Sequence, residues 1–248
     1  MATFHHEDLK GSEFTQVTLR GSRFVESDLS GVVIRGSEVS GLEIDAPWLI
    51  YGEPLTINGV DVVAYVEAEL DRRFPGRAQR QATDPGGLRA AWASCEGAWD
   101  AAIARAATLP AGVVDESVDH EWSFAQTLRH LVHATDLWFV GAVLREDEPL
   151  HPLGLGDTSA VEEGLVGASA DVPPYDDVLA ARADRVALVR DFLATVTTET
   201  LGEARHNPHD PEQPETVRSC VHTVLEESWE HLRFALRDLD AIEANRPS

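Results

Sequence analysis

Large apolar side chains stand at every fifth position over the first part of the chain. The row consists of Phe4, Leu9, Phe14, Leu19, Phe24, Leu29, Ile34, Val39 and Ile44. A period of five matches neither an amphipathic helix nor a half-buried strand, whose periods are about 3.6 and two residues. Small residues mostly stand two positions before each member of the row, and glycine recurs at positions 11, 21, 31, 36 and 41. The pattern therefore indicates a stack of short repeats.

These nine consecutive pentads resemble the pentapeptide-repeat family, in which four pentads form one turn of a right-handed, quadrilateral β-solenoid. The resemblance implies that the central side chains stack inside, so we expect Phe14 and Phe24 to be buried. Nine pentads make little more than two coils, and so short a stack needs a cap because each repeat buries its apolar row only against its neighbours. We expect residues 1–46 to be this solenoid, serving either as a folding and docking appendage or as a surface for a protein partner.

The pattern changes after Ala46-Pro47 to short apolar segments separated by turn residues. Asn58-Gly59 predicts a tight turn between two short strands. The stretch that follows, residues 61–74, has apolar residues at helical spacing and is followed by Pro75-Gly76, which predicts a short amphipathic helix. We expect residues 47–83 to bridge two larger modules.

Four longer amphipathic segments follow, each with helical spacing of its apolar residues. The first begins at Asp84-Pro85, an N-cap residue followed by proline at the first helical position. The second begins with capping-box spacing between Ser123 and Gln126. The third is expected over residues 175–195, after a loop-rich connection over 147–174, and the fourth over 216–242. Four such helices predict a bundle over residues 84–248, where facing side chains can build metal sites. The fold class is therefore α+β multidomain, a short β-solenoid followed by a four-helix bundle.

Charge narrows the range of partners. The chain has 20 Lys and Arg against 43 Asp and Glu, a net charge of -23. This charge repels phosphate backbones and anionic lipid, so we expect neither nucleic acid nor membrane as a partner. Residues 1–46 hold eight acidic and four basic residues, a net charge of −4, which argues against an acidic DNA mimic there. Two cysteines, Cys95 and Cys220, and an N-terminus without an apolar signal segment favour the cytoplasm.

Four of the ten histidines fall in expected helices: His130 and His133 in the second, His222 and His231 in the fourth. Glu227 and His231 are four residues apart, which puts a carboxylate and an imidazole on one helical face. His222 and Glu226 form a second pair at the same spacing. Spacing alone therefore leaves both pairs open.

Two stretches resemble the DinB/YfiT-like superfamily, in its branch of mycothiol-dependent enzymes. The stretch EWSFAQTLRHLV at residues 121–132 resembles the metal-bearing second helix, and EESWEHLRFALRDL at residues 226–239 resembles the fourth. The resemblance implies a DinB-like four-helix bundle and carries over His130, Glu227 and His231 as three ligands of a divalent cation. Many relatives have histidine where Glu227 stands.

Three ligands leave an open coordination position, as catalytic zinc sites do, and there a bound water or thiol has a lowered pKa. Zinc is the first expectation; nickel, iron or manganese would suit the same ligands. The resemblance implies a transferase or isomerase that uses a low-molecular-weight thiol such as mycothiol on a small electrophilic substrate. The alternatives are a non-catalytic protein-binding module that uses residues 1–46, and a metal-dependent hydrolase.

Other polar and aromatic residues of the expected helices have simpler roles. Cys220 is expected to pack in the core rather than to be a fourth ligand, and Trp138 and Trp229 are expected in the core as well. The arginines Arg129, Arg233 and Arg237 would hold an anionic substrate or, more simply, pair with nearby acids. Glu226 and Glu230 are expected on a solvated face.

Overall fold

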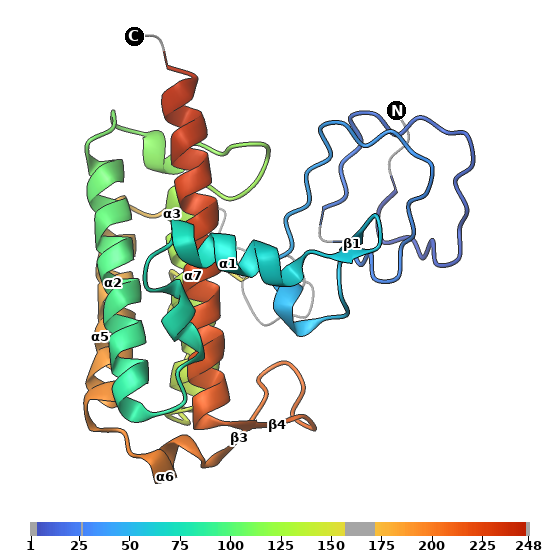
Figure 1. Ribbon diagram of the computed structural model, residues 1–248. Coiled ribbons are helices and arrows are strands. Elements are labelled where there is room, and N and C mark those ends of the chain that lie inside the picture. The colour runs from blue at the N-terminus through green and yellow to red at the C-terminus, as the bar shows by residue number, and fades with distance from the viewer. Residues whose placement is uncertain (1–3, 26, 157–171, 247–248) are drawn as a thin grey trace. The chain divides into compact units, whose positions relative to one another are not determined.

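The computed structural model describes residues 4–25, 27–156 and 172–246. It divides the chain into two compact units, Met1–Asp45 and Ala46–Ser248 (Figure 1). Within these described residues no helix is both long enough and apolar enough to cross a membrane.

The first unit is a succession of tight turns. Backbone hydrogen bonds close turns from Ser12 N to Leu9 O and from Ser22 N to Leu19 O. Two further turns of the same kind are closed at Val32 and Leu42. Gly11 and Gly21, at the third position of these turns, have φ of 77° and 73°, the left-handed region that type II turns require. Positive φ recurs every fifth residue at His6, Gly11, Gln16, Gly21, Gly31, Gly36 and Gly41.

The apolar row of this unit is exposed, so the predicted burial of Phe14 and Phe24 is wrong. Their exposed fractions are 58% and 61%, and the other members of the row are exposed as well. Residues 4–25 and 27–45 contain no strand, and the structure shows no solenoid. The physical reason is length: nine pentads provide too few neighbouring repeats to cover the side chains of the row.

The second unit opens with η1 (Leu49–Tyr51) and a two-stranded antiparallel hairpin of β1 (Thr56–Ile57) and β2 (Val60–Asp61). Asn58 and Gly59 connect the strands and both have positive φ, as the tightest hairpin turns require. Helix α1 (Val63–Arg73) follows as predicted, and η2 (Arg77–Gln81) comes after it. Although η2 lies in the expected bridge, it packs against two long helices, α2 and α7.

The four predicted long helices are present. They are α2 (Pro85–Ala107), α3 (Phe124–Thr135), α5 (Tyr175–Thr195) and α7 (Val217–Ala244). Asp84 caps α2 by accepting hydrogen bonds from the backbone N–H groups of Gly86 and Gly87, and Ser123 and Gln126 form the predicted capping box of α3. The shorter elements are η3 (Val113–Asp115), α6 (Thr198–Leu201) and the hairpin of β3 (Ala204–His206) and β4 (Pro214–Thr216).

Helix α3 continues into a π-helical segment, η4 (Asp136–Gly141), which the spacing did not reveal. The predicted connection over 147–174 has no helix or strand in residues 147–156, and its residues 157–171 lie outside the described part of the chain.

The long helices form a bundle in which α2 and α3 each pack against both α5 and α7 (Figure 1). Their apolar faces meet in one core. Its largest fully buried side chains include Trp92, Trp229, Phe139, Leu88 and Leu128. The bundle therefore brings the middle of α3 against α7, the two helices that carry the predicted ligands.

Candidate metal centre

The three residues expected as metal ligands lie together between α3 and α7. One potential ligand atom each of His130, Glu227 and His231 can be chosen so that all three lie within 4.8 Å of one another. Oε2 of Glu227 is 3.4 Å from Nε2 of His130 and 3.3 Å from Nδ1 of His231. The side chains are 12–15% exposed, so the cluster is shielded without being closed to solvent.

Backbone carbonyls orient both imidazoles. Nδ1 of His130 donates to the carbonyl oxygen of Leu155 at 3.2 Å, and Nδ1 of His231 donates to that of Glu227 at 2.9 Å. A carbonyl only accepts, so Nδ1 carries the proton and Nε2 keeps a lone pair in each neutral ring. Fixing one ring nitrogen by a backbone acceptor is how proteins prepare histidine to bind a metal.

Electrostatics keep His231 neutral. Burial, helped by the neighbouring His130 ring, lowers the pKa of His231 to about 4. At neutral pH this imidazole therefore carries no charge, and the lone pair is available. Nε2 of His130 faces Oε2 of Glu227 at 3.4 Å, so a nitrogen and a carboxylate oxygen from two helices meet at this point. The donor set thus fits a divalent metal.

Aromatic rings wall the cluster. The His130 and His231 rings stack with centroids 4.5 Å apart, and Trp122 lies 4.6 Å from the His130 ring. Phe234 meets His231 edge-on at 5.7 Å. Because Trp122 directly precedes the Ser123 cap, the start of α3 fixes its position beside the imidazoles.

A short strap, residues 151–155, runs along α3 and carries the carbonyl that holds His130. The His151 N–H donates to Oδ2 of Asp136 at 2.7 Å, and the Leu155 N–H donates to the Arg129 carbonyl at 3.1 Å. In return, Nε of Arg129 donates to the Leu153 carbonyl at 3.0 Å. Arg129 is therefore committed to backbone contacts.

The competing histidines have other surroundings. His222 donates from Nε2 to the Ala82 carbonyl at 2.7 Å, and burial lowers its pKa. The His133 ring is buried with its centroid 6.4 Å from that of His130. Among the residues that the structure describes, only His130, Glu227 and His231 form a cluster suited to a metal ion.

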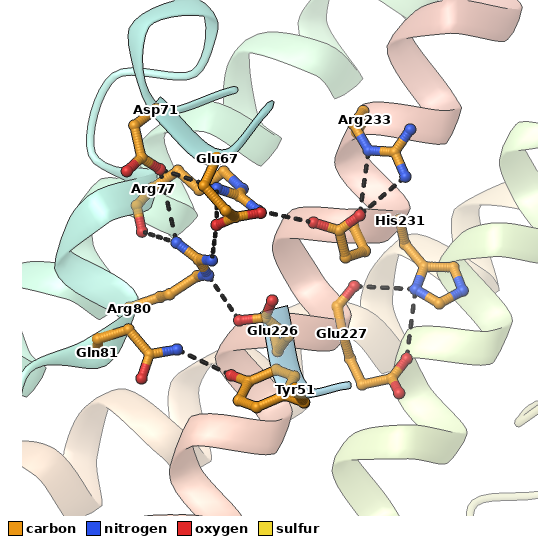
Figure 2. A network of polar contacts seen from close by, with 11 residues as sticks. Tyr51, Glu67, Asp71, Arg77, Arg80, Gln81, Glu226, Glu227, His231 and Arg233 are labelled. Carbon is orange, nitrogen blue, oxygen red and sulfur yellow. Dashed lines mark hydrogen bonds and ion pairs between the residues drawn. The ribbon is translucent and has the colours of Figure 1, made fainter. Parts of the chain in front are cut away.

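The expectation that Glu226 and Glu230 lie on a solvated face is wrong. They are 2% and 3% exposed, and they pair with two buried arginines of η2. Nε of Arg80 donates to Glu226 at 2.6 Å, and Nη2 of Arg77 lies 3.3 Å from Glu230 (Figure 2). Glu67 of α1 accepts from both arginines.

This ion-pair network is the part of the site region that sequence reasoning missed. Figure 2 shows it on one side of α7, with Glu227 and His231 pointing to the other side. Burial raises the pKa of Glu226 although the Arg80 guanidinium favours its charged form. A signal was present, since Arg77 and Arg80 are three residues apart and Glu226 and Glu230 four, spacings that put each pair on one helical face.

The expectations for the cysteine, tryptophan and arginine side chains of these helices can be compared with the structure. Cys220 and Trp229 are buried in the core, and Trp138 packs against it. Arg233 pairs with Glu230 at 2.8 Å, and Arg237 pairs with Asp238 at 2.8 Å, so the acids of the chain do engage these arginines.

Comparison with known proteins identifies the family of the chain. No curated protein and no solved structure matches the chain. The family model of the DinB superfamily matches residues 63–235, from α1 through most of α7. The match includes η2 and all three clustered residues, and it leaves residues 1–62 outside. Because it spans more than half of the sequence, the chain belongs to the DinB superfamily.

Proposed function

We propose that this protein is a metal-dependent enzyme of the DinB superfamily in which His130, Glu227 and His231 hold a divalent cation. The observation that supports it is the convergence of the three side chains within 4.8 Å. Both imidazoles are already oriented by backbone carbonyls, so the site is preorganised for a metal.

Two nitrogens and one oxygen suit zinc first, and nickel, iron or manganese as well. Bound there, the cation would act as a Lewis acid that lowers the pKa of a coordinated thiol or water. The reaction class we propose is transfer of a low-molecular-weight thiol, such as mycothiol, to a small electrophile, or isomerisation with that thiol. Membership of the superfamily and the ligand set support this choice.

The protein side chains would position the reactants. Trp122 and Phe234 line the imidazoles with apolar surface, which favours an organic substrate beside the cluster. The Leu155 carbonyl and the Glu227 carbonyl keep the protons of both rings on Nδ1. The partial exposure of all three ligands leaves a path for a small molecule to reach them.

Metal content tests the site. Protein purified without an affinity tag is expected to contain about one equivalent of a divalent metal by elemental analysis, because three preorganised ligands suffice for binding. His231→Ala and Glu227→Gln should lose it. His222→Gln, on the same helix, should keep it, since a Gln amide can still donate to the Ala82 carbonyl. Unchanged metal content in His231→Ala would contradict the site.

Thiol dependence tests the reaction class. The metal-loaded protein is incubated with an electrophile such as a haloarene or an epoxide, with mycothiol, cysteine or no thiol, and product is followed by mass spectrometry. Thiol conjugates, or thiol-dependent isomerisation of the electrophile, are expected only with an intact cluster. Hydrolysis of the haloarene or epoxide without thiol would instead identify a hydrolase.

A protein-binding role for residues 1–46 is the second candidate. The observation that favours it is the exposed apolar row, since large apolar patches on soluble proteins mark interaction sites. Replacing Phe14 and Phe24 by serine should then weaken capture of a partner without changing metal content.

A further inference from the structure

A cavity of about 220 Å³, partly open to solvent, lies between α2 and α5. Most of its wall is apolar, with Trp92, Trp99, Ile103, Leu128, Leu179 and Val186, and four charged residues complete it: Glu96, Asp100, Arg182 and Arg190. None of the three proposed metal ligands lines it. The cavity is therefore a different site from the candidate metal centre.

Arg182 of α5 lines this cavity and is 4% exposed. Nη1 of its guanidinium is buried and has no hydrogen-bond partner among residues 4–25, 27–156 and 172–246. Nη2 makes only a long contact, 3.5 Å, to the Ser228 hydroxyl. Burial lowers the pKa of Arg182 to about 10, so the guanidinium still carries its charge at neutral pH.

A second donor in the cavity wall is also unsatisfied. Nε1 of Trp92 is buried and has no partner within the described part of the chain. Cys95 lines the cavity too, but burial raises the pKa of its thiol to about 12, so at neutral pH it is not a counter-ion. Glu96 and Asp100 also line the cavity, but Glu96 pairs with Arg190 at 3.3 Å and Asp100 is exposed to solvent. Within the described part of the chain, the buried donors Nη1 of Arg182 and Nε1 of Trp92 therefore have no hydrogen-bond acceptor, although two acids stand in the cavity wall.

We propose that this cavity binds a small monocarboxylate with an apolar tail, its carboxylate on Arg182. Burying an unpaired charge and unpaired donors is costly, and an anion would remove that cost. A guanidinium matches a carboxylate in charge and in its forked geometry. The aromatic and aliphatic walls favour an apolar tail, and the volume limits the ligand to the size of a short-chain fatty acid or a benzoate.

Calorimetric titration and thermal unfolding test this with hexanoate and benzoate as probes, and with hexanamide and hexanol as neutral controls. All titrations use the His231→Ala full-length chain in EDTA, so that coordination to a metal cannot mimic binding. Both carboxylates should bind and raise the unfolding temperature by mass action, whereas the neutral probes should bind at least tenfold more weakly. Equal binding of hexanol and hexanoate, or no binding of either acid at 10 mM, overturns the proposal.

Two cavity variants, with one control variant, test where the carboxylate binds. Arg182→Met, nearly isosteric and uncharged, should lose at least tenfold in carboxylate affinity while its ligand-free unfolding temperature is no lower than the parent's. Arg218→Met removes an exposed arginine of α7 and should bind like the parent. Ala183→Phe narrows the cavity at an exposed position and keeps Arg182, so it tests the site even if Arg182→Met does not fold. Parental affinity in either cavity variant overturns the proposal.

Discussion

Glu226 and Glu227 are neighbours in the chain and have different roles, because successive residues of a helix point about 100° apart. Glu227 faces α3 and approaches His130, whereas Glu226 faces η2 and pairs with Arg80. The carboxylate chemistry is the same in both. What differs is the partner that the fold supplies: an imidazole for Glu227, and a buried guanidinium for Glu226.

Replacing Arg80 by methionine is expected to lower the free energy of unfolding by about 3–5 kcal/mol, because it leaves Glu226 buried without its counter-charge. Urea denaturation measures the change. Arg72→Met, whose side chain is 70% exposed, is the control and should show no measurable change. The double variant Arg80→Met/Glu226→Leu should recover part of the loss. A single variant as stable as the parent would show that the network contributes little.

The ends of α3, as well as its buried face, position groups of the candidate site. Helix α3 begins at a capping box, and the ring of the residue before the cap, Trp122, lies tilted against the His130 ring. The strap of residues 151–155 also holds α3: its first N–H donates to Asp136, in the π-helical turn that follows the helix. One element therefore positions a ligand, the ring beside it and the carbonyl that orients it.

Ser123→Ala should lower the free energy of unfolding by about 1 kcal/mol, the usual loss when an N-cap hydroxyl is removed. Thr223→Ala in α7 is the matched control, because that hydroxyl bonds only within its own helix, to the Ser219 carbonyl, and alanine favours helix. Chemical denaturation of both variants provides the comparison. Equal stability of Ser123→Ala and the parent would exclude a role for the cap.

At the scale of the whole molecule, the buried core and the candidate metal site belong to the second unit. Every residue of the buried core cluster, and all three clustered ligands, lies within Ala46–Ser248. The net charge of -23 is spread over the chain, and the absence of DNA binding that it implies stays a prediction, as does the cytoplasmic location.

A chain shortened to residues 46–248 is therefore expected to keep the metal content and the unfolding temperature of the full chain. Elemental analysis and calorimetry of the two proteins test this side by side. A truncated chain that is empty of metal, or that unfolds at a much lower temperature, would show that residues 1–45 support the bundle.

The sequence alone determined the local features of this protein. Caps, turns and helical spacing depend on residues within a few positions of one another, so α2, α3, α5 and α7 were predictable, and so was the turn at Asn58-Gly59. The pairing of Glu227 with His231 is also local. Selecting that pair over His222 and Glu226 needed the resemblance to a family, because both pairs have the same spacing.

Tertiary structure alone decided which faces meet and what is buried. The approach of His130 to Glu227, the pairing of Arg80 with Glu226, and the enclosure of Arg182 between α2 and α5 join residues far apart in the chain. The exposure of Phe14 and Phe24 was decided at the same level, since a five-residue period determines where turns fall but not whether enough neighbouring chain exists to cover a side chain. Burial depends on the number and placement of distant neighbours, and local sequence does not encode that.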